Sequence, residues 1–209
     1  MTDQDLQQLL KLGHELPGRE FKGPGRRTDK AFLARVIRAV IGMANRRDGG
    51  VVIVGVDPTT VEPVGLEEDQ ADTWTYDALA TNVNEYASPS VSFDFERKLY
   101  LGHTLVIIEV HEFAEIPILC GKDFHTTNEK KAPPILRRGA CYVRSGHKPE
   151  TSEIPSWEEM RELLELATDK GVRKFLERAQ RVGLFQPVQP PPMPPDDPAR
   201  FDAQTKDMA

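Results

Sequence analysis

The chain of 209 residues carries 27 basic and 33 acidic side chains, for a net charge of −6, and 39% of its residues are hydrophobic. This composition is typical of a single globular domain with a substantial core, and two cysteines are too few for a disulfide framework. The N-terminus lacks a secretory signal pattern, and the longest apolar run, residues 51–56, is far shorter than the roughly 20 residues of a membrane span. We therefore expect a cytoplasmic protein that contacts no membrane.

Hydrophobic periodicity predicts an α+β fold, in which helices flank a mixed β-sheet. A long helix is expected over 28–47, capped by Thr28 and ended by Gly49-Gly50. The segment 51–56 is apolar on both faces, which predicts a central strand onto which this helix packs. The apolar stripe of the helix consists of Leu33, Val36, Ile37, Val40, Ile41 and Ala44. The other predicted elements are helices at 2–12 and 72–87, a hairpin of strands at 91–97 and 104–110, and strands at 117–124 and 140–144.

The same patterns divide the chain into three parts. Residues 1–150 are expected to form the folded domain. Residues 151–185 form a C-terminal helical extension that starts at the capping box of Ser156 and is broken at Gly171. Residues 186–209 are rich in proline and poor in apolar side chains, which predicts a disordered tail.

Charge is spread unevenly along the sequence. Residues 19–47 contain nine basic and two acidic side chains, so this segment is +7 and the rest of the chain is −13. A second basic group consists of Arg137, Arg138, Arg144 and Lys148. Such asymmetry indicates a surface that meets phosphates, although a solvated helix face would give a similar pattern.

Three carboxylates are candidates for a metal site. Strand alternation places Phe21 in the core and directs Glu20 and Lys22 to the opposite side, while a Pro-Gly turn can bring Glu15 close to Glu20. Asp57 follows the central strand. Carboxylate oxygens suit Mg²⁺ or Mn²⁺, and Lys22 would steady a reacting phosphate. The alternative is that both glutamates balance nearby arginines and that Asp57 is a turn residue.

Other catalytic signatures are absent from the sequence. The Gly121-Lys122 pair is followed by Asp123, so it does not form a phosphate-binding loop, and no serine-hydrolase or zinc-protease motif occurs. Cys120, His125, Cys141 and His147 match no zinc-finger spacing, so zinc is disfavoured.

Four segments resemble the Schlafen AlbA-type domain family, in its bacterial single-domain form. The segment from Glu15 to Lys22 resembles its E-x-x-x-x-E-F-K opening. Its helix-to-strand segment is matched by Ala44-Asn45, Gly49-Gly50 and the Gly-Val-Asp that ends at Asp57. Gly65-Leu66 resembles the Gly-Leu that follows in the family, and residues 142–146 resemble its closing Y-x-R-x-G strand.

The resemblance implies a function in nucleic-acid binding. In animal members three acidic residues form a metal-dependent endoribonuclease centre for tRNA and rRNA, and the corresponding residues here are Glu15, Glu20 and Asp57. Bacterial members are described as nucleic-acid-binding or ATP-binding modules, often in regulators. The chain lacks the second lobe and the zinc ligands of the animal proteins, so a groove between lobes would require a homodimer.

The sequence therefore indicates two alternative functions. The first is a metal-dependent endoribonuclease acting on structured RNA such as tRNA, with Glu15, Glu20, Asp57 and Lys22 as its catalytic residues. The second is a non-catalytic DNA- or RNA-binding or ATP-binding regulatory module. In both, RNA is favoured over DNA as the partner, and the residues expected to contact phosphates are Arg26, Arg27, Arg137, Arg138, Arg144 and Lys148.

Overall fold

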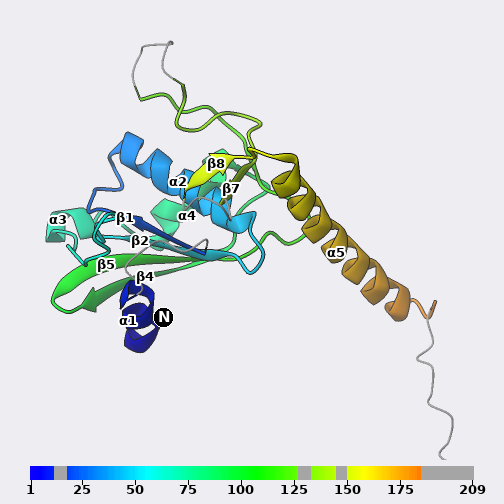
Figure 1. Cartoon of the computed structure of the whole chain (residues 1–209), viewed down its shortest axis with the longest axis horizontal. Coiled ribbons are helices and arrows are strands. Elements are labelled where there is room, and N and C mark those ends of the chain that lie inside the picture. The colour runs from blue at the N-terminus through cyan, green and yellow to red at the C-terminus, as the bar shows by residue number, and fades with distance from the viewer. Residues whose placement is uncertain (12–17, 127–132, 145–149, 185–209) are drawn as a thin grey trace, which may run out of the picture. The chain divides into compact units, whose positions relative to one another are not determined.

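A computed structural model describes residues 1–11, 18–126, 133–144 and 150–184 (Figure 1). The helices are α1 (Asp3–Lys11), α2 (Lys30–Ala44), α3 (Glu68–Ala71), α4 (Tyr76–Tyr86) and α5 (Trp157–Arg181). The strands are β1 (Arg19–Lys22), β2 (Gly50–Val54), β3 (Ala87–Ser88), β4 (Phe93–Tyr100), β5 (His103–Val110), β6 (Leu119–Cys120), β7 (Tyr142–Arg144) and β8 (Thr151–Glu153). This arrangement confirms the predicted α+β class.

The main sheet has the strand order β1-β2-β5-β4, in which β1 and β2 are parallel and the other neighbours antiparallel. The strand predicted to be central, β2, lies inside the sheet, and β4 and β5 form the predicted hairpin. β1 is an edge strand of this sheet. β7 and β8 form a separate antiparallel pair, as do β3 and β6.

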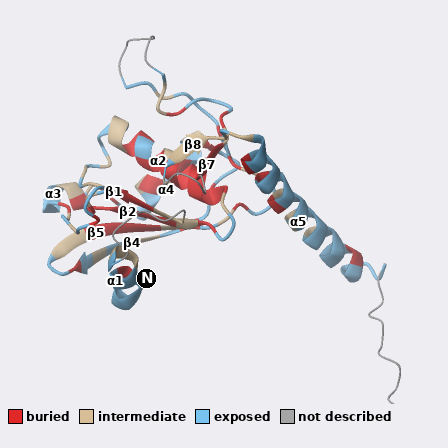
Figure 2. Ribbon diagram, viewed as in Figure 1, coloured by how far each residue is buried: buried red, intermediate tan, exposed pale blue. Residues whose placement is uncertain are grey.

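Both faces of the sheet are covered by helices (Figures 1 and 2). Because side chains alternate along β2, Val52 and Val54 belong to the larger core beneath α2, while Val51 and Ile53 belong to a smaller core that includes Leu6 of α1. Ile37 of α2 is fully buried, which confirms that the predicted stripe packs on the sheet.

The ends of α2 differ from the prediction. Asp29, not Thr28, is the N-cap, and its carboxylate accepts hydrogen bonds from the backbone N–H groups of Ala31 and Phe32. The helix ends at Ala44, before Gly49-Gly50, because the next residue, Asn45, turns its side chain into the core. Its amide donates to the carbonyl oxygens of Ile118 and Tyr142, at 2.8 Å each.

The prediction that Gly171 breaks the C-terminal helix was wrong, because α5 runs without interruption through this residue. A glycine costs about 1 kcal/mol in a helix, which is too little to end a helix of 25 residues. The chain comprises two compact units, Met1–Gly171 and Val172–Ala209. The proposed boundary at residue 150 falls directly before β8, and the tail at 186–209 lies outside the described residues. No helix in the described ranges is both long and apolar enough to cross a bilayer.

Candidate nucleic-acid interface

A groove of about 730 Å³ opens beside the edge strand β1. It is bounded by β1, α2, the loop after β2 and the β7–β8 pair, so it collects residues from segments distant in sequence. The lining residues are Glu20, Phe21, Lys22, Gly23, Phe32, Arg35, Arg38, Pro58, Thr59, Val61, Arg144, Glu150 and Thr151. We call this space the β1 groove.

The base of the β1 groove is an ionic network centred on Glu20. One carboxylate oxygen of Glu20 lies 2.5 Å from Nζ of Lys22, and the other accepts hydrogen bonds from Nη1 of Arg144 at 2.9 Å and from Oγ1 of Thr151 at 2.7 Å. The Glu20 and Arg144 side chains are 6% and 1% exposed. Since both are shielded from water, the Glu20 carboxylate needs the positive charges of Arg144 and Lys22 for compensation.

Local geometry explains why these groups meet. Glu20 and Lys22 pair in register with Val52 and Val54, so they lie on the sheet face that α2 covers. β8 approaches α2 closely at Gly42, where an added Cβ atom would lie 2.5 Å from Cγ2 of Thr151. A side chain at position 42 would therefore displace Thr151 from Glu20.

One wall of the β1 groove carries two arginines of α2, one turn apart. The Arg38 guanidinium lies 5.0 Å from the ring centroid of Tyr142, and its Nε is buried without a hydrogen-bond partner. Arg35 is exposed and forms no ion pair with the residues that the structure describes. Sequence reasoning did not assign either residue to the interface. The sequence feature that could have indicated them is that both arginines lie outside the apolar stripe of a helix that contains no acidic residue.

The basic residues predicted from the sequence are not gathered in this groove. Arg26 forms an exposed ion pair with Asp69, and Arg27 donates to the carbonyl oxygen of Thr73 and to the side chain of Asn82. Neither lines the β1 groove.

The second predicted basic group is also dispersed. Arg137 pairs with Glu153 through two hydrogen bonds, and this pairing lowers the pKa of the Glu153 carboxyl. Arg138 is exposed, and its backbone N–H bonds to Asp123. Lys148 lies outside the described residues. Of the predicted set, the described residue that lines the β1 groove is Arg144.

The three predicted metal ligands have different positions. Glu15 lies outside the described residues. Asp57 does not line the β1 groove, although its neighbours Pro58 and Thr59 do. Its carboxylate accepts hydrogen bonds from the backbone N–H groups of Thr60 and Thr59, which lower its pKa.

The described donors do not fit a divalent-cation centre. Both oxygens of Glu20 are engaged by two cations and a hydroxyl group, and one oxygen of Asp57 is held by its own turn. Within the described ranges, no three His, Cys, Asp or Glu side chains are grouped so as to hold a metal ion. With Glu15 outside these ranges, the Mg²⁺ or Mn²⁺ site stays a prediction.

Both thiols donate to backbone carbonyl oxygens, Cys120 to that of Lys122 and Cys141 to that of Ile118. Cys120 is buried, and burial raises the pKa of Cys141 from its ordinary value of 9.0 to about 11. A protonated thiol is a poor metal ligand, so this environment does not favour zinc.

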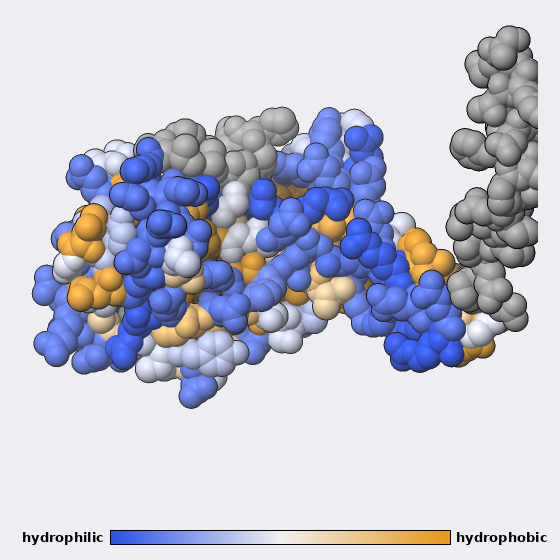
Figure 3. All heavy atoms as spheres, turned by 90° about the horizontal axis from the view of Figure 1, so that it is seen from below, coloured by the Kyte–Doolittle hydropathy of each residue, from blue (hydrophilic) through white to orange (hydrophobic). Residues whose placement is uncertain are grey.

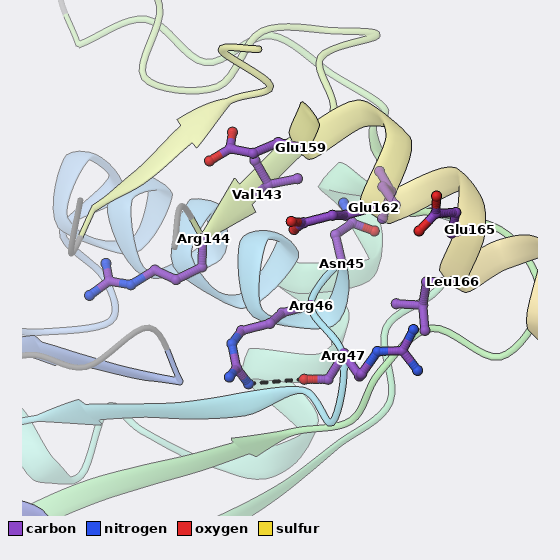
Figure 4. A pocket seen from close by; sticks show the side chains of 10 residues that line it. Asn45, Arg46, Arg47, Val143, Arg144, Glu159, Glu162, Glu165 and Leu166 are labelled. Carbon is purple, nitrogen blue, oxygen red and sulfur yellow. Dashed lines mark hydrogen bonds between the residues drawn. The ribbon is translucent and has the colours of Figure 1, made fainter. Parts of the chain in front are cut away.

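A second pocket, of about 350 Å³, lies between the end of α2 and the first half of α5 (Figure 4). Glu159, Glu162 and Glu165 of α5 line it together with Arg46 and Arg47. The carboxylate oxygens of Glu159 are buried without hydrogen-bond partners. Arg46 donates to the carbonyl oxygen of Arg47, which turns its guanidinium back toward the loop before β2.

Comparison with known proteins adds two structural likenesses. The chain is 23% identical to the N-terminal domain of a RecG-related protein from Nitrosomonas europaea, covering 75% of this chain and 97% of that one at a TM-score of 0.45. It is 19% identical to the DIP2311 protein from Corynebacterium diphtheriae, also at a TM-score of 0.45, covering 66% of this chain but only 22% of the other.

No curated protein sequence matches the chain significantly. The family model described as "Schlafen, AlbA_2" matches residues 17–152, which confirms the resemblance in the sequence motifs. The match runs from the segment before β1 to β8, and it therefore includes every residue that lines the β1 groove. The chain belongs to the Schlafen, AlbA_2 family.

Proposed function

We propose that the chain binds the phosphate backbone of a nucleic acid, with RNA as the preferred partner, in the β1 groove. Family membership suggests a role connected with nucleic acids. The observation that carries the proposal is the pair formed by Arg35 and Arg38, which line the groove and form no salt bridge with a described acidic residue, although the charge of Arg38 helps to lower the pKa of Glu153.

Guanidinium groups suit this task because their planar N–H donors match phosphate oxygens. Arg38 has a buried Nε that lacks a partner, and leaving such a donor unpaired is unfavourable. A phosphate oxygen is the kind of acceptor that would satisfy it. Glu20 acts in this proposal as a positioning residue, because it holds Lys22 and Arg144 at the base of the groove.

The proposal is tested by fluorescence anisotropy with labelled tRNA and with duplex DNA at several salt concentrations. Arg35→Ala combined with Arg38→Ala should weaken RNA binding and flatten its salt dependence. The slope of log K against log salt should decrease by about 0.7 for each single-strand phosphate that the protein no longer neutralises.

Arg97→Ala is the matched control, because Arg97 is an exposed arginine that does not line the β1 groove. It should leave both affinity and salt slope close to those of the parent chain. Equal losses in the control and the double variant would contradict the proposal, as would tighter binding of duplex DNA than of tRNA.

Two more specific functions rest on the family resemblance and not on the geometry of the described residues. Cleavage of structured RNA requires the predicted metal centre, which includes Glu15. An ATP-binding regulator would use the same phosphate chemistry of Arg35 and Arg38. Competition by ATP against labelled tRNA separates the two ligands, since efficient displacement would favour the nucleotide over RNA as the ligand of the groove.

A further inference from the structure

The pocket between the end of α2 and the first half of α5 is not lined by Arg35 or Arg38, the arginines proposed to bind phosphate. It holds about 350 Å³, and all of its lining residues belong to the compact unit Met1–Gly171. On the face of the molecule shown in Figure 3, apolar side chains form small groups among hydrophilic ones, which favours recognition through pockets over a broad apolar surface. We call this space the α5 pocket.

Glu159 places a carboxylate in the α5 pocket without a partner. The residue is 9% exposed, and its two carboxylate oxygens are buried and accept no hydrogen bond from the residues that the structure describes. A carboxylate shielded from water is unfavourable unless a positive charge or hydrogen-bond donors compensate it. The described chain supplies no such group to Glu159.

The capping role that the sequence predicts at the start of α5 does not account for this carboxylate. In a capping box, Ser156 would bind the backbone N–H of Glu159, and the carboxylate of Glu159 would bind the backbone N–H of Ser156. The first bond is present, at 3.3 Å, but the carboxylate takes no part in the second. Figure 4 shows the side chain of Glu159 on the same side of α5 as Val143 of β7, which also lines the pocket.

The three arginines that line the α5 pocket are each held by another group. Their partners are Glu20 for Arg144, Asp169 for Arg47, and the carbonyl oxygens of Arg47 and Gly49 for Arg46. Figure 4 shows Arg46 and Arg144 directed away from α5. The positive charges nearest to the pocket therefore do not neutralise Glu159.

The other lining residues indicate the chemistry of a ligand. Glu162 lies one helical turn after Glu159, so two neighbouring carboxylates favour a positively charged group. Within the described ranges no three His, Cys, Asp or Glu side chains are grouped to hold a metal ion, which disfavours a metal here. Leu163 and Leu166 add apolar surface, which suits the alkyl chain of an organic cation.

We propose that the α5 pocket binds an organic cation that carries one alkylammonium or alkylguanidinium group. The cationic group donates hydrogen bonds to the carboxylates of Glu159 and Glu162, and its alkyl chain packs against Leu163 and Leu166. A single positive charge fits better than a polyamine, because Arg46 and Arg47 also line the pocket.

This chemistry is shared by free alkylamines and by the lysine or arginine side chains of a partner protein. The proposal does not depend on what the β1 groove binds.

NMR titration of the full chain, labelled with ¹⁵N, by n-butylammonium chloride tests the site, with sodium chloride at equal ionic strength as the reference. Shift changes should centre on the amides of Glu159 and Glu162. Glu159→Gln should raise the dissociation constant at least roughly 30-fold, the range expected when one partner of a buried charge pair is removed. Glu158→Gln is the matched control, because it removes the same charge from an exposed neighbour that does not line the pocket, and it should bind like the parent chain.

A capped tripeptide with a central lysine separates the two sources of the cation. Binding of the peptide as well as of n-butylammonium supports a side chain of a partner protein, and binding of n-butylammonium alone supports a free alkylamine. The absence of shift changes with both probes would overturn the proposal. Equal losses in Glu158→Gln and Glu159→Gln, or the same shift changes with magnesium chloride alone, would overturn it too.

The melting temperature of the unliganded chain gives an independent readout. Glu159→Gln should melt at a higher temperature than Glu158→Gln, because it removes a buried charge that the folded chain does not compensate. A lower melting temperature would show that the carboxylate already has a partner in the folded chain, which would contradict the proposed site.

Discussion

Glu20 and Arg144 illustrate how strongly a single pair of residues couples the groove to the fold. Removing one partner of a buried ion pair leaves an uncompensated charge, which costs about 3–5 kcal/mol, although the pair itself adds little net stability. The network therefore fixes the geometry of Lys22 and Thr151 more than it increases the stability of the chain.

A double-mutant cycle in urea should reveal this coupling. Arg144→Met and Glu20→Gln should each lower the free energy of unfolding, because each change removes one side of a buried ion pair. Lys22 still neutralises Glu20 in Arg144→Met, so the loss should stay below the roughly 3–5 kcal/mol of a fully uncompensated buried charge. The double variant should lose less than the sum of the two single changes. Additive losses would contradict a direct interaction between the two side chains.

Sequence reasoning treats Glu20→Gln as a change that preserves the fold. The buried ion pair alters that expectation, so any RNA-binding or cleavage assay with this variant needs a parallel measurement of folding. Alternation along β1 is enough to predict the side of the strand on which Glu20 lies. Its partner could not be predicted, because Arg144 lies 124 residues later and no local pattern links the two.

Cys141 provides a prediction about pH. Because burial favours the neutral thiol, the folded-state pKa of about 11 is higher than the ordinary value of 9.0. The contribution of this group to stability is therefore complete below pH 9 and is lost as the pH rises toward 11. Thiol labelling of the folded chain at pH 8 should be slow relative to the unfolded chain, and Cys141→Ala should weaken the decline in stability above pH 9. Rapid labelling at Cys141 in the folded chain would contradict this environment.

At the scale of elements, α2 joins the core to the candidate interface. Its buried side packs on the sheet, while Arg35 and Arg38 border the β1 groove. The 3.6-residue period of the helix predicts both its buried and its exposed side correctly, because polar residues outside the apolar stripe face away from the core. The period does not predict that β7 and β8 would close the groove opposite these arginines.

Ile37→Ala tests the packing of α2. Because Ile37 is fully buried, the change should lower the free energy of unfolding by about 2–5 kcal/mol, measured by urea denaturation. Lys30→Ala, an exposed change near the start of the same helix, serves as the control and should alter stability far less. A loss below about 0.5 kcal/mol at position 37 would be inconsistent with a close-packed core there.

Element boundaries were predicted less well where tertiary contacts decide them. A helix over 72–87 was expected, but the structure starts it at Tyr76, as α4, and has a short unpredicted helix, α3, before it, with a break at 72–75 between the two. In this break the indole N–H of Trp74 donates to the carbonyl oxygen of Gly25 at 2.9 Å, while Thr75 caps α4. A hydrogen bond to a residue 49 positions away leaves no trace in local periodicity.

At the scale of the whole molecule, the prediction to be tested is metal-dependent cleavage of RNA. Purified chain incubated with total tRNA and Mn²⁺ or Mg²⁺ should produce fragments that are abolished by a chelator, if the predicted centre of Glu15, Glu20 and Asp57 forms. Glu15→Gln is the variant of choice, because Glu20→Gln would also break the buried ion pair with Arg144. RNA fragments that form without metal, or undiminished cleavage by the Glu15 variant, would contradict the nuclease prediction and leave nucleic-acid binding as the function.

The long separation between Glu20 and Arg144 also orders events during synthesis. At 5–20 residues per second, a ribosome needs on the order of 6–25 s to reach Arg144 after it has added Glu20. Throughout that interval β1 carries a carboxylate whose neighbouring cation is Lys22. The base of the groove is thus completed only after Arg144 and Thr151 have been added, so a nascent chain shorter than this cannot present the finished site to the ribosomal and messenger RNA that surround it.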